Sequence, residues 1–151
     1  MDISDSFKEI IKYSHFWNWA PDWSLVEEIY LAFPNSFSVL SPFAYSYLEE
    51  IIRSTTSEYG MVLLDENSKP KKRKVGYDLI KLAIEENKSN KPDYVMILDE
   101  IKSYYTQSQS NDEGDNRHSV VHGYMHPRFW NKESFEKLIF DIARLSKYSG
   151  F

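Results

Sequence analysis

Apolar residues recur at helical spacing along most of the chain, and this pattern constrains the fold more than any other feature. Asn131 lies between Trp130 and Phe135, as an N-cap does between the two residues of a hydrophobic staple. Strict alternation of apolar and polar residues, which half-buried strands need, is scarce. The chain is therefore predicted to be all-α. The last helix is the clearest, because one of its faces contains five apolar residues: Phe135, Leu138, Ile139, Ile142 and Leu145.

The same spacing predicts five earlier helices, separated by proline, glycine and polar residues. Phe16 and Leu25 are among the apolar residues expected to face the core in the first two. Asp22 is predicted as the N-cap of the second helix. Ser41 is predicted as an N-cap with Pro42 in the first helical position, and Gly60 at or beyond the end of that helix. We expect one domain over residues 1–151, a bundle of five to six helices in which 1–40 precede a core of 41–151. The earlier helices are expected at about 4–19, 22–33, 41–59, 75–87 and 93–105.

Composition excludes several classes of site. The chain of 151 residues has no cysteine, so disulfides, thiolate zinc sites and cysteine nucleophiles are ruled out. Its net charge of -5 argues against a broadly basic surface for nucleic acid, although a local basic cleft is compatible with it. Aromatic residues make up 16%, which is typical of a ring-rich core or interface. The acidic N-terminus and the lack of a long apolar run predict a cytoplasmic protein with no membrane segment.

A cluster of cations interrupts the acidic chain at Lys71, Lys72, Arg73 and Lys74. The surrounding residues 65–74 are polar, so the cluster is expected in a loop between helices. A solvated loop is the commonest role of such a run, and a contact with RNA is the second interpretation.

Residues 116–124 contain the most specific functional pattern. If the stretch is helical, Arg117 and His122 lie within about one and a half turns of each other. A permanent cation then stands beside a group that exchanges a proton near neutral pH. Phosphodiester cleavage needs one group of each kind. With Tyr124 two residues further on, chance alone gives this pattern on the order of once in a hundred such chains.

His118, His122 and His126 also repeat every four residues, which is the spacing of a metal-binding stripe on a helix. Gly123 and Pro127 interrupt that helix, and no acidic residue completes a zinc-protease pattern. The sequence therefore predicts neither a metal nor another cofactor.

The pattern Arg117-x4-His122-x-Tyr124 resembles the Arg-x4-6-His motif of the HEPN superfamily, a group of small all-helical domains. His118 matches the polar residue that often follows the arginine. The form with a tyrosine is similar to HepT-type toxins, and the segment followed by an amphipathic helix also resembles abortive-infection HEPN proteins. Leu48-Glu49 is a looser likeness to the family's acidic core helix.

The resemblance implies a metal-independent ribonuclease. His122 would exchange protons with the ribose 2′-OH or the leaving oxygen, Arg117 would stabilise the charge on phosphorus oxygens, and His118 would orient the phosphate or move a second proton. It also implies a homodimer, RNA as substrate, and an antitoxin of the nucleotidyltransferase type. Packing is the favoured role for Tyr124, and adenylylation by the antitoxin is the alternative.

Two other classes of function remain open from sequence. One is a non-catalytic HEPN-like module that binds nucleotide, RNA or protein, with Arg117 as an anchor for an anion. The other is a structural helical dimer in which Arg117 and His122 are buried at the interface.

Overall fold

The structure, a computed structural model, describes residues 1–105 and 131–151. All regular elements in these two ranges are helical, apart from one isolated bridge between Leu64 and Pro70, so the all-α prediction is confirmed. In chain order the elements are α1 (Ile3–Tyr13), α2 (Ala20–Ala32), the 3-10 turn η1 (Pro34–Ser36), α3 (Phe37–Ser54), α4 (Gly76–Asn87), α5 (Pro92–Ile101), the 3-10 turn η2 (Lys102–Tyr105) and α7 (Lys132–Ser146).

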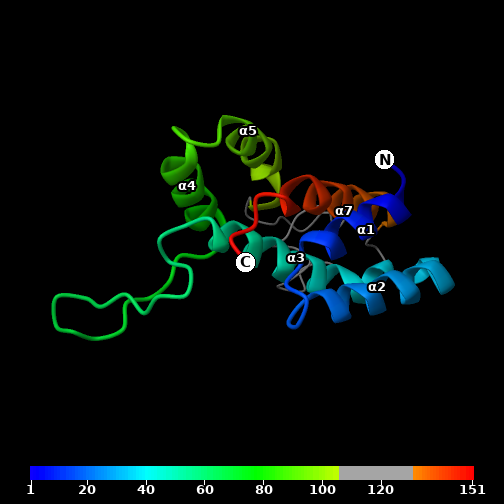
Figure 1. Cartoon of the computed structure of the whole chain (residues 1–151), viewed down its shortest axis with the longest axis horizontal. Coiled ribbons are helices and arrows are strands. Elements are labelled where there is room, and N and C mark those ends of the chain that lie inside the picture. Colours follow the sequence, from blue (N-terminus) through cyan, green and yellow to red (C-terminus); the bar gives the residue numbers. More distant parts are fainter. Residues whose placement is uncertain (106–130) are drawn as a thin grey trace.

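Helix α7 packs against α1, α3 and α5, while α2 packs against α1. Figure 1 shows α1, α2, α3 and α7 running side by side, with α4 and α5 at one end of the bundle. The predicted apolar face of α7 is confirmed, since all five of its residues are buried. No helix of the described ranges is long and apolar enough to cross a membrane.

Aromatic rings form much of the core where α1, α2 and α3 meet. Trp23 and Tyr47 are fully buried, and their ring centroids lie 5.1 Å apart at an interplanar angle of 75°. Phe7 lies 6.2 Å from Trp23 and 5.9 Å from Tyr30. Such tilted and edge-on pairs stabilise a core beyond the area that they bury. The expected role of the aromatic residues in the core is therefore confirmed.

The first helix is shorter than predicted, and Phe16 is a wrong core prediction. Helix α1 ends at Tyr13 because Ser14 is extended, with its hydroxyl donating to the carbonyl of Ile10 at 2.8 Å. The same hydroxyl lies 2.8 Å from the Tyr47 hydroxyl of α3, a contact between residues distant in sequence. The following turn places Phe16 in solvent, with 80% of it exposed.

Helix α3 begins earlier than predicted. It starts at Phe37, directly after η1, so Pro42 lies inside the helix and Ser41 is not an N-cap. A proline there removes one backbone hydrogen bond. The extra turn places Leu40 in the core, which offsets that loss by apolar burial. Gly60 follows the end of α3 with φ at 68°, a backbone region that favours glycine.

Three smaller corrections concern the second and fifth predicted helices. Asp22 is not an N-cap, because α2 already begins at Ala20 and Asp22 lies in its first turn. Leu25 was expected in the core but is 54% exposed. The helix predicted over 93–105 ends at Ile101 and continues as the tighter turn η2.

Replacing Asn131 by alanine should lower the free energy of unfolding by about 1 kcal/mol, the usual effect of losing an N-cap. The Asn131 side chain accepts a hydrogen bond from the backbone N–H of Ser134 at 2.7 Å, as the predicted cap requires. Urea denaturation followed by circular dichroism measures the change. Lys132→Ala in the same turn is the control and should change stability by less than the cap does. Equal losses in the two variants would contradict the capping role.

Stability should fall as the pH rises above 10, because buried tyrosines resist ionisation. Burial raises the pKa of Tyr47 from its ordinary value of 10.0 to about 12. Burial also raises the pKa values of Tyr94 and Tyr30. Between the unfolded and folded pKa values the folded chain binds more protons, so the free energy of unfolding decreases with pH. Urea denaturation at a series of alkaline pH values tests this. A flat profile up to pH 12 would contradict the prediction.

Candidate functional site

The motif residues Arg117, His118, His122 and Tyr124 lie outside the described residues. Their roles stay predictions. The structure does describe the elements that precede and follow residues 106–130, which are η2 and α7.

The described elements on either side of residues 106–130, η2 before them and α7 after them, are hydrogen-bonded to each other. Tyr104, in the turn η2 before the segment, donates a hydrogen bond from its hydroxyl to Oδ2 of Asp141 in α7 at 2.8 Å. Lys137, in the second turn of α7, donates from Nζ to the Tyr104 hydroxyl and to Oδ2 of Asp141, both at 3.0 Å. These bonds hold the residues before the segment against the helix that follows it.

Asp141 is the centre of this network. The residue is only 4% exposed, yet it keeps a charge partner on each side. Arg144 donates to its Oδ1 at 3.2 Å and to Oε2 of Glu100 in α5 at 2.6 Å. The hydrogen bond to Glu100 raises the pKa of Arg144. A buried carboxylate of this kind is tolerated because Tyr104, Lys137 and Arg144 all donate to it.

A pocket of about 220 Å³ opens beside the network and is lined by Ser103, Tyr104, Ser134 and Lys137. Burial, together with the nearby charge of Asp141, raises the pKa of Tyr104, so its phenol stays protonated at neutral pH. The Lys137 ammonium is balanced by Asp141. The described lining of the pocket therefore offers hydrogen-bond donors to an oxygen-rich group, and none of these described residues is a base for general catalysis.

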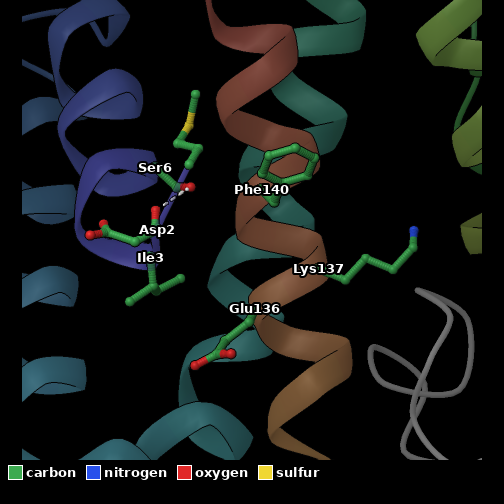
Figure 2. Close-up of a pocket in the computed structure, with 7 residues that line it drawn as sticks. Asp2, Ile3, Ser6, Glu136, Lys137 and Phe140 are labelled. Carbon is green, nitrogen blue, oxygen red and sulfur yellow. Dashed lines mark hydrogen bonds between the residues drawn. The ribbon is translucent and has the colours of Figure 1, made fainter.

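A second pocket, of about 380 Å³, lies between the start of α1 and α7. Figure 2 shows Asp2, Ile3 and Ser6 on one side of it, and Glu136 and Lys137 leaving α7 in different directions. Its polar groups bond within the protein, since Glu136 accepts from the Tyr30 hydroxyl at 2.6 Å and Ser6 donates to the Asp2 carbonyl at 2.9 Å. Two carboxylates beside this opening would repel a phosphate, so we assign it no role in RNA binding.

The cluster Lys71 to Lys74 is exposed, as expected of a loop, and lies on an arm formed by residues 61–75. The base of the arm is anchored to α3. Arg53 is 9% exposed and donates to the carbonyl of Lys74 at 2.8 Å, while Glu58 accepts from the N–H of Lys74 at 3.0 Å. Glu49 accepts from the N–H of Gly76 at 2.7 Å, so this residue of the looser family likeness caps the start of α4.

Sequence reasoning did not find the network of Tyr104, Lys137 and Asp141. A signal was present, because Asp141 lies next to the apolar face of α7 and has Lys137 four residues before it and Arg144 three residues after it. A charge at the edge of an apolar face with two cations in reach indicates a buried ion pair. Among residues 1–105 and 131–151, no three His, Asp or Glu side chains lie close enough together to hold a metal ion.

Comparisons with known proteins do not identify the chain: no family model matches it, and no curated protein or solved structure matches it significantly. The function must therefore be argued from the residues of the chain itself.

Proposed function

We propose that this protein is a HEPN-type endoribonuclease that cleaves RNA without a metal ion. The observation that supports the proposal is the motif Arg117-x4-His122 on a segment that joins the capped core helix α7 of an all-helical protein. Outside the motif, Tyr104 of η2, two residues before segment 106–130, is hydrogen-bonded to Asp141 and Lys137 of α7, the helix that follows it.

In the proposed reaction, His122 removes the proton of a ribose 2′-OH, and the 2′-oxygen attacks the adjacent phosphorus. The bond between phosphorus and the 5′-oxygen breaks, and that oxygen leaves with a proton from a second group. Arg117 stabilises the negative charge that develops on the phosphate oxygens. The products are a 2′,3′-cyclic phosphate and a 5′-OH end.

One imidazole cannot act as base and acid in the same step, so the proposal needs a second proton-transfer group. His118 can supply it, or the motif of a second copy can, if two protomers place their motifs together. A homodimer with RNA as substrate, acting as a toxin or in antiphage or stress defence, fits this scheme. A nucleotidyltransferase-type antitoxin would then act on Tyr124 or bind near it.

The requirement for a 2′-OH gives a direct experiment. Purified protein in EDTA is incubated with an RNA oligonucleotide and with the same sequence made of 2′-deoxynucleotides. Cleavage of the RNA alone is expected, because the deoxy strand lacks the internal nucleophile. Cleavage of both strands would reject the mechanism. Binding of the RNA with no cleavage would favour the non-catalytic module, with Arg117 anchoring a phosphate.

A further inference from the structure

The arm of residues 61–75 is an ordered projection. It turns back on itself between Leu64 and Pro70, where Lys71 donates from its N–H to the carbonyl of Leu63 at 2.7 Å. The Asp65 carboxylate accepts from the N–H groups of Asn67 at 2.8 Å and Lys69 at 3.0 Å, which closes the tip. Figure 1 shows the arm extending away from the bundle and from α2.

The two sides of the arm differ in chemistry. The outgoing side exposes Met61, Val62 and Leu64, with 57%, 69% and 58% of each residue in solvent. The returning side exposes five cations against the two acids at the tip: Lys69, Lys71, Lys72, Arg73 and Lys74. An exposed apolar run next to a cluster of cations is typical of a binding element.

Helix α2 also exposes apolar residues, but its charged residues are acids and not cations. Trp23, Val26 and Tyr30 face the core, but the solvent side also exposes Leu25 and Leu31 at 54% and 52%. A helix that is apolar on both sides is normally covered on both sides. The exposed apolar surface continues beyond α2 with Phe33 and Val39.

The charge of α2 complements that of the arm. The helix contains three acids and no cation, and residues 13–52 contain no lysine or arginine at all. Glu28 is exposed between the two leucines, and Glu27 is half-buried beside it. The surface of Leu25, Glu27, Glu28 and Leu31, called the α2 face below, can therefore pair apolar with apolar and acid with cation against the arm.

We propose that the arm of one copy binds the α2 face of a second copy, and that two such contacts related by a two-fold axis form a dimer. The arm points away from its own α2, so the contact forms between copies. Each protomer gives one arm and receives one, which closes the assembly at two. This inference does not depend on ribonuclease activity.

A second copy of the chain can bind both the apolar and the basic residues of the arm. An anionic polymer or an anionic membrane fits fewer of them. Nucleic acid would leave Met61, Val62 and Leu64 in water, and residues 61–75 contain no aromatic ring on which a base could stack. An anionic membrane approached tip first would meet Asp65 and Glu66.

Sedimentation of the full chain over a range of concentrations tests the proposal, with two charge-reversal variants and their combination. The arm variant is Lys71→Glu with Lys72→Glu, and the helix variant is Glu27→Lys with Glu28→Lys. We expect a dimer for the parent chain, and a dissociation constant at least about tenfold higher for each variant. The chain with all four changes should recover the dimer, because its reversed arm meets a reversed face.

Circular dichroism of each variant checks that it is still helical. Val62→Ser, which changes no charge, should weaken the dimer as well. Several results would overturn the proposal: a parent chain that is monomeric throughout, a dimer that neither reversal weakens, or no recovery in the combined variant. If the parent is monomeric and the arm variant instead loses binding to RNA or to anionic vesicles, the arm's partner is nucleic acid or lipid.

Discussion

Replacing Arg117 or His122 by alanine should lower the rate of RNA cleavage by about 10²- to 10⁴-fold. For His122 the loss is that of the proton-transfer group, and for Arg117 that of the cation opposite the developing charge. Single-turnover cleavage of a labelled RNA under enzyme excess measures both. Arg117→Lys should recover only part of the rate, because an ammonium ion cannot bind two phosphate oxygens as a guanidinium does.

Matched controls separate this role from general effects of losing a charge or a ring. Arg128→Ala removes an arginine outside the motif, and His15→Ala removes a histidine in the turn between α1 and α2. Both should retain the parent rate. His118→Ala should reduce the rate less than His122→Ala if it only orients the phosphate, and equally if it moves the second proton. Activity in Arg117→Ala equal to that of Arg128→Ala would contradict the proposed site.

Replacing Asp141 by alanine should lower the free energy of unfolding by about 3 kcal/mol. The change leaves the buried hydroxyl of Tyr104 with no acceptor at Asp141, and it removes a charged hydrogen bond from Lys137 and another from Arg144. Lys137 and Arg144 can turn to water, since 62% and 27% of their side chains are exposed, so the buried phenol accounts for much of the loss. Urea denaturation measures the change.

Asp99→Ala is the matched control, because Asp99 also pairs with a lysine, Lys102, at 2.6 Å but is 52% exposed. Surface pairs of this kind contribute about 0 to 1 kcal/mol. Asp141→Asn, which keeps an acceptor for Tyr104, should fall between the two alanine variants. If Asp141→Ala destabilises the chain no more than Asp99→Ala, the network of Asp141 does not stabilise the fold as proposed.

Local signals in the sequence were enough to predict α7 and α4. In α7 the cap at Asn131 and the buried face from Phe135 to Leu145 depend on residues within a few turns of one another. In α4 the apolar spacing over 75–87 matches the observed helix, Gly76–Asn87. Such elements are specified by their own residues, and tertiary contacts only reinforce them.

Elements that depend on distant contacts were not predicted. Ser14, which follows the end of α1, contacts Tyr47 of α3, and the early start of α3 buries Leu40. Exposure of Leu25 was missed because helical spacing shows which residues are apolar but not which side of an apolar helix meets the core.

Some residues of the candidate site could be found from the sequence, and others could not. Arg117 and His122 were found from a short motif, because their chemistry and spacing are visible in the sequence. Asp141 and Tyr104 are 37 residues apart and meet only in the fold. The pairing of η2 with α7 therefore could not be predicted, although these two elements flank the segment that contains the motif.

The most direct test of the central claim is to identify the ends of RNA cut in EDTA by the parent chain and by the variant with both Arg117→Ala and His122→Ala. Mass spectrometry of the fragments should show 2′,3′-cyclic phosphate and 5′-OH ends with the parent chain, and intact RNA with the variant. Intact RNA with both proteins, or the same fragments from both, would contradict the assignment of this chain as a metal-independent ribonuclease.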